Sequence, residues 1–86
     1  MIEVKRKNEQ EFMVTIEDKG STTKHAVTLD DSYYQHLTGG KISQEEFIKK
    51  SFEFLLERES KESILSEFNL RVIKNYFPEF EEEVKE

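Results

Sequence analysis

The sequence predicts an α+β protein, in which an N-terminal three-stranded antiparallel β-meander is followed by three to four helices. Residues 1–29 alternate apolar with polar residues between short polar turns, which is typical of strands with one buried face. From residue 30 onward the apolar residues recur at steps of three and four, the spacing that gives a helix one apolar side. We therefore expect the helices to cover one face of the meander.

The length of the chain sets its expected domain organisation. A chain of 86 residues buries only about two-thirds of its extended surface, which is too little to build two separate cores. We expect residues 1–86 to form a single domain, with the meander in residues 1–29 and the helical part in residues 30–86. The acidic end, residues 82–86, is expected to fray.

Three segments are predicted as strands: Ile2–Lys5, Glu11–Glu17 and Thr23–Leu29. The second and third are joined by Asp18–Ser21, a polar stretch that reads as a hairpin turn. Gly20 supplies the positive φ that such a turn needs. The residues expected on the inner face of these two strands are Phe12, Val14, Ile16, His25, Val27 and Leu29.

The helical part begins with a short predicted helix, Ser32–Leu37. Asp30 or Asp31 is expected to cap its start, because a carboxylate can accept a hydrogen bond from a free amide of the first turn. Gly39 is expected to end it, because glycine adopts the left-handed conformation that follows many helices.

The main predicted helix is Ser43–Arg58, and we expect the rest of the fold to be organised around it. Ser43 and Glu46 have the spacing of a capping box, in which each side chain binds a backbone amide near the other residue. One side of this helix is strongly apolar and needs a partner layer. Its apolar residues are Phe47, Ile48, Phe52, Leu55 and Leu56.

Two further helices and a final turn are predicted after the main helix. Residues 60–68 have apolar side chains at helical spacing, and Asn69 is expected to cap a last helix over residues 70–77. Pro78 can start one more turn, because proline is accepted at the first helical position. The apolar residues of the first of these helices are Ile64, Leu65 and Phe68.

Three segments of the C-terminal half are similar to sequences found elsewhere. SFEFLLERE (Ser51–Glu59), ESILSEF (Glu62–Phe68) and VIKNYFPEF (Val72–Phe80) resemble a group of small bacterial and archaeal hypothetical proteins. The resemblance implies a recurring domain. It has no function attached to it, so no functional residue is carried over.

Composition narrows the classes of function. The chain has no cysteine, which excludes disulfides and thiolate chemistry and suits a reducing compartment. The net charge of -6 lies wholly in residues 30–86, and an acidic surface repels phosphate backbones, which counts against nucleic-acid binding. No apolar run approaches the roughly 20 residues of a membrane span, and the first residues lack the apolar stretch that is typical of a signal peptide. We expect a cytoplasmic protein that does not bind membranes.

Candidate catalytic and ligand-binding residues are few. His25 and His36 are the only histidines, and no HxH or HxxxH spacing brings two metal ligands together. The Gly39–Ser43 stretch resembles a phosphate-binding turn, but Ile42 follows Lys41 where that motif requires Ser or Thr. We therefore predict no enzyme activity, cofactor, metal or small-molecule ligand, and leave open an anion contact near Lys41 and Ser43.

The carboxylate pairs have a structural explanation. Asp30 with Asp31, and Glu45 with Glu46, are adjacent in sequence and point in directions about 100° apart on a helix, so neither pair can share a proton. Capping and compensation of the helix dipole account for both pairs.

A protein-interaction or regulatory role is the predicted function. The helical half has more large aromatic residues than one side of a three-stranded sheet can cover, and surplus apolar area at a surface marks association. We expect Phe54, Tyr76 and Phe80 to form this surface, and a protein partner or a second copy in a homodimer to cover it. The alternative, in which the last helices wrap around the main helix and bury all of them, stays open.

A second function, DNA binding by a ribbon-helix-helix dimer, is kept as an alternative. The strand over residues 24–29, the short helix, the glycine turn and the capped helix match the order of elements in those DNA-binding and antitoxin proteins. However, the outward residues Lys24, Ala26 and Thr28 offer only one cation and little hydrogen bonding to bases. The preceding strand also competes for the edge that dimerisation would use.

Overall fold

The N-terminal meander is confirmed by the computed structural model, which describes residues 1–86. Strands β1 (Ile2–Arg6), β2 (Glu11–Asp18) and β3 (Ser21–Thr28) are consecutive and antiparallel. The turn between β2 and β3 has positive φ at two residues, 53° at Lys19 and 80° at Gly20, which matches the twist of the strands it joins.

The sheet has a fourth strand that the sequence did not predict. We expected a helix over residues 60–68, and this prediction is wrong. A 3₁₀ helix, η1 (Lys61–Ser63), is followed by an irregular segment and by β4 (Glu67–Asn69), which pairs in parallel with β3. The outer edge of β3 explains the difference, because its backbone groups need partners: the Ala26 amide donates to the Ser66 carbonyl oxygen at 2.8 Å.

The first two helices begin and end close to their predicted limits. Helix α1 (Asp31–Thr38) ends at Gly39, which has φ 62°, and α2 (Gln44–Leu56) starts after the predicted capping box. Asp30 occupies the cap position of α1 but makes no capping hydrogen bond. Its carboxylate instead accepts a hydrogen bond from the Arg71 guanidinium at 2.7 Å, which ties the start of α1 to the C-terminal part of the chain.

The C-terminal part is more ordered than we expected. Asn69 caps a second 3₁₀ helix, η2 (Leu70–Val72), which runs into α3 (Ile73–Tyr76). The last helix, α4 (Phe80–Val84), includes three of the residues that we predicted to fray. Val84 is only 1% exposed, and the Glu86 amide donates to the Leu37 carbonyl oxygen at 2.8 Å.

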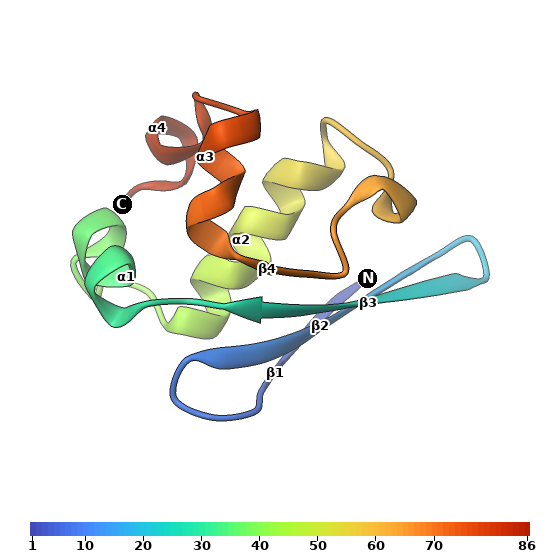
Figure 1. Cartoon of the computed structure of the whole chain (residues 1–86), viewed down its shortest axis with the longest axis horizontal. Helices are drawn as coiled ribbons and strands as arrows, with labels where there is room; N and C mark the ends of the chain where they lie inside the picture. Colours follow the sequence, from blue (N-terminus) through green and yellow to red (C-terminus); the bar gives the residue numbers. More distant parts are fainter.

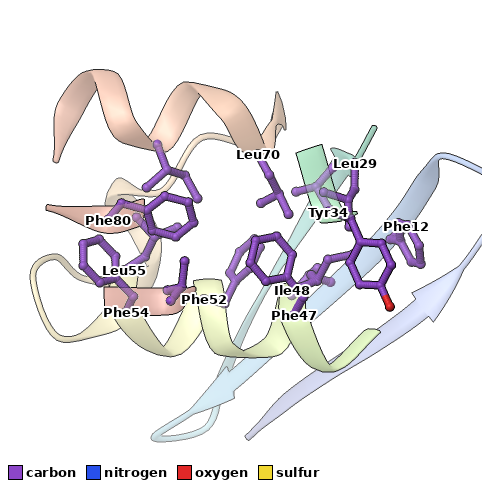
Figure 2. Close-up of a cluster of buried hydrophobic side chains, with 14 of the residues drawn as sticks. Phe12, Leu29, Tyr34, Phe47, Ile48, Phe52, Phe54, Leu55, Leu70 and Phe80 are labelled. Carbon is purple, nitrogen blue, oxygen red and sulfur yellow. The ribbon is translucent and has the colours of Figure 1, made fainter. Parts of the chain in front are cut away.

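The sheet has the order β1-β2-β3-β4, and the helices lie on one side of it (Figure 1). Helix α2 packs between the sheet and the C-terminal helices, in contact with both β1 and α4. Figure 2 shows the resulting core, in which aromatic rings from α2 meet side chains of the sheet and of the C-terminal helices. None of the helices combines the length and the apolar character that crossing a membrane requires.

Candidate functional site

Two of the three aromatic residues predicted to form an interaction surface are buried. Phe54 is 4% exposed and Phe80 is fully buried, whereas Tyr76 is 65% exposed. The Phe54 ring lies 5.2 Å from that of Phe80 and 5.9 Å from that of Phe77 between centroids, and the Arg58 guanidinium lies over it at 3.6 Å. Our prediction for Phe54 and Phe80 was wrong because α4, which begins at Phe80, packs against α2 and brings the two rings together in the core (Figure 2).

Tyr76 belongs instead to an apolar groove of about 300 Å³ between α2, β4 and α3. We call it the α2–α3 groove. Eight of its ten lining residues are hydrophobic, a composition typical of sites that receive apolar side chains. The lining residues are Leu55, Glu59, Ser63, Ile64, Leu65, Phe68, Val72, Ile73, Tyr76 and Phe77.

The groove has a buried floor and an exposed rim. Leu55, Ile64 and Ile73 are buried and form the floor. Leu65, which is 48% exposed, and Tyr76 form the rim, and with Met1 they are the only large hydrophobic residues that are exposed. The exposed apolar surface of the protein is therefore concentrated at this groove.

Leu65 was not predicted as a site residue. The spacing of Ile64, Leu65 and Phe68 suggested one side of a helix, which would have given all three a common buried face. In the irregular segment between η1 and β4, Ile64 is buried and Leu65 is exposed, although both line the groove. No local signal distinguishes the two residues.

A buried histidine holds the rim in place. The Nδ1 atom of His25 lies 2.8 Å from the Leu65 carbonyl oxygen, and its Nε2 atom lies 2.9 Å from the Thr23 hydroxyl. A carbonyl oxygen can only accept, so Nδ1 carries the proton and Nε2 accepts from Thr23 when the ring is neutral. The His25 ring also packs on Phe52, with centroids 5.6 Å apart. The groove is thereby fixed to the sheet.

The charge at the groove is acidic. Glu59 is the only charged lining residue, and its carboxylate makes no ion pair. Four cations belong to nearby segments, and each is paired with a carboxylate elsewhere. The pairs are Arg58 with Glu57, Glu79 and Glu83; Lys61 with Glu62; Arg71 with Asp30; and Lys74 with Glu81.

A second hollow, of about 320 Å³, lies beside the start of β1 and is mainly polar. It includes the buried side chain of Lys61, whose ammonium lies 2.9 Å from the Glu62 carboxylate. This hydrogen bond lowers the pKa of Glu62 below its ordinary value. The one buried cation of this hollow is therefore already neutralised.

The residues considered for metal or anion binding lie apart from both hollows. His25 has partners on both ring nitrogens, and His36 is exposed on α1. No group of three or more His, Cys, Asp or Glu side chains is close enough to hold a metal ion. At the start of α2, Ser43 accepts from the Glu46 amide and Glu46 accepts from the Ser43 amide, so the capping box occupies these groups.

Strand β4 occupies part of the edge that the ribbon-helix-helix alternative needs, because it pairs with Ala26–Thr28 of β3. Strand β3, which would pair with a second chain in such a dimer, has β2 on one side and β4 on the other. A ribbon dimer would require one of these two strands to detach. This topology disfavours the alternative.

Comparison with known proteins adds no relative. No family model, curated protein or solved structure matches this chain. The side chains themselves are therefore the basis for inferring a function.

Proposed function

We propose that the protein is a non-catalytic, cytoplasmic interaction module whose α2–α3 groove binds a short segment of a partner protein. The observation that carries this proposal is the concentration of exposed apolar surface at Leu65 and Tyr76, beside buried apolar residues that line the same groove. Grooves of this kind usually receive two or three apolar anchor residues from a helix or strand of the partner. A volume of about 300 Å³ has room for one or two such side chains.

The charge around the groove indicates the chemistry of the partner. The Glu59 carboxylate is unpaired at the groove, and the cations of the nearby segments are all paired with other carboxylates. Complementary charge favours encounter with a basic segment and opposes an acidic one. The occupant that fits is an amphipathic peptide with apolar anchors next to Lys or Arg.

Selection from a random peptide library tests this proposal. We expect the selected peptides to combine large apolar residues with at least one Lys or Arg, and to shift the amide resonances of Leu65 and Tyr76 when titrated. Because a few central residues carry most of the energy of a small interface, Leu65→Ala and Tyr76→Ala should each weaken binding about tenfold or more. Glu59→Gln should weaken binding at low salt and have less effect at high salt.

The control is Met13→Ala, which shortens a partly exposed apolar residue on the open face of the sheet. This variant should bind the selected peptides as tightly as the parent protein. Peptides that shift resonances elsewhere, or that bind Leu65→Ala and Tyr76→Ala unchanged, would contradict the proposal.

A further inference from the structure

Strand β1 has a free edge, and the register of the sheet identifies its free backbone groups. The Glu17 amide donates to the Met1 carbonyl oxygen at 2.9 Å, and the Lys7 amide donates to the Glu11 carbonyl oxygen at 2.8 Å. Hydrogen-bonded and non-hydrogen-bonded pairs alternate along antiparallel strands. The odd-numbered residues of β1 therefore bind β2, and the backbone groups of Ile2, Val4 and Arg6 point away from the sheet.

No other part of the chain covers this edge. Strand β1 pairs only with β2, and none of its outward-pointing backbone groups has a partner. Proteins protect such an edge with a proline, a bulge, a covering loop, a short strand or charged side chains. Strand β1 is five residues long and has three charged side chains, of which Arg6 is paired with Glu45. The other two, Glu3 and Lys5, are opposite in sign. This strand has no proline, and its register with β2 runs without a bulge from Ile2 to Arg6.

The side chains of β1 are complementary to a second copy of the same strand. We propose that β1 pairs antiparallel with β1 of another molecule, with Val4 opposite Val4 at the centre. Ile2 then lies opposite Arg6, so the residues with free backbone groups meet one another, and each such pair can exchange two hydrogen bonds. Glu3 lies opposite Lys5 twice, once on each side of the two-fold axis.

The charges support this register in particular. Glu3 and Lys5 project from the open face of the sheet, and within one chain their charged atoms are 4.0 Å apart. Opposite each other across two strands they would form a non-hydrogen-bonded pair, the type in which side chains come closest. In a two-fold interface each contact occurs twice, with the two molecules exchanged. Here Glu3 of each molecule faces Lys5 of the other, so both contacts are attractive.

The proposed dimer is independent of the groove. Strands β1 and β4 are the opposite edges of the sheet, and the α2–α3 groove is next to β4. Pairing through β1 would join two sheets into one and leave both grooves open. Failure of dimerisation would therefore leave the proposed function untouched, and failure of peptide binding would leave the dimer untouched.

Sedimentation equilibrium with charge-exchanged variants tests the dimer. Glu3→Lys places two lysines opposite each other on both sides of the axis, and Lys5→Glu does the same with two glutamates. Each variant should dimerise about tenfold or more weakly than the parent, because two attractive pairs become repulsive. The double variant, Glu3→Lys with Lys5→Glu, restores both attractions and should dimerise like the parent.

The control is Lys24→Glu, which makes the same change of charge on the same open face but on β3. Its dimerisation should equal that of the parent. A parent protein that stays monomeric at about 1 mM, where even a weak specific dimer would form, overturns the proposal. Single exchanges that leave the dimer unchanged, or a double exchange that fails to restore it, also overturn it.

Hydrogen exchange gives a second measurement at the level of single residues. The amides of Glu3 and Lys5 bind β2 and should be protected at every protein concentration. The amides of Val4 and Arg6 should become protected only as the concentration rises. If Val4 and Arg6 exchange rapidly in a sample that is dimeric by sedimentation, the dimer uses another surface.

Discussion

His25 links the buried core to the rim of the groove. Its imidazole packs on Phe52 and its Nδ1–H donates to the Leu65 carbonyl oxygen. A buried polar group that loses its partner costs more than the hydrogen bond itself is worth, because the remaining group stays desolvated. The position of Leu65 therefore depends on a residue that no binding partner would touch.

Replacing the histidine with a ring that cannot form hydrogen bonds tests this dependence. His25→Phe keeps much of the packing on Phe52 but leaves the Leu65 carbonyl without a donor. We expect the free energy of unfolding to fall by about 1–3 kcal/mol. Urea unfolding measures this loss, and selected peptides should bind more weakly in proportion to the disorder of Leu65.

Thr23→Val is the matched variant, because it removes only the hydrogen bond to Nε2. It should cost less than His25→Phe and leave peptide binding unchanged. Equal effects of the two variants on peptide binding would show that the Leu65 contact has no special role.

Among the elements, α4 is a short helix that is held in place by its packing against α2. It covers the end of α2: Phe80 packs on Phe54, and Arg58 reaches across to Glu79 at 3.1 Å and to Glu83 at 2.8 Å. The five residues of this helix could not form a stable helix alone. Packing against α2 therefore stabilises it, and in return it shields the aromatic residues of α2 from water.

Truncation of the aromatic residues distinguishes the buried ring from the exposed one. Phe80→Ala leaves a cavity beside Phe54 and should lower the free energy of unfolding by about 3–5 kcal/mol. Tyr76→Ala removes an exposed ring and should change it by no more than about 0.5 kcal/mol. Thermal or urea unfolding of the two variants provides the comparison, and equal losses would contradict the placement of α4.

For the whole molecule, the chain has the dimensions of a compact domain and an excess of negative charge. The radius of gyration of 12.1 Å agrees with the value of about 12 Å expected for a compact domain of this length.

Three surface carboxylates have a pKa below the ordinary value of 4.5. The Ser43 amide lowers the pKa of Glu46, the Lys61 ammonium that of Glu62, and the Glu79 amide with Arg58 that of Glu79.

These lowered pKa values predict how stability depends on pH. A carboxylate whose pKa is lower in the folded protein stabilises the fold above the pKa of the unfolded chain and loses this effect as the pH falls through the folded value. The urea midpoint should therefore decrease when the pH is lowered from about 7 to about 3. Replacing Glu46, Glu62 and Glu79 together with Gln should make the decrease smaller, and an unchanged decrease would contradict the prediction.

The sequence predicted an element correctly where the interactions that form the element are between residues close together in the chain. The alternation in β2, the positive φ at Gly20 and the capping box at Ser43 involve residues within a few positions of one another, and the structure has all of them. The main helix and the meander followed from these signals. Tyr76 was predicted to be at the surface because the helical half has a surplus of large aromatic residues, and its ring is 65% exposed.

By itself, then, the sequence determined the first three strands, α1 and α2, since their hydrogen bonds and turns are satisfied between near neighbours. Tertiary structure alone decided that residues 67–69 form a strand and that Phe54 and Phe80 are buried. A three-residue strand is too short to show a period, and it forms because β3, about forty residues earlier, has unpaired backbone groups. The groove likewise exists only where α2, β4 and α3 meet, so no single segment could reveal it.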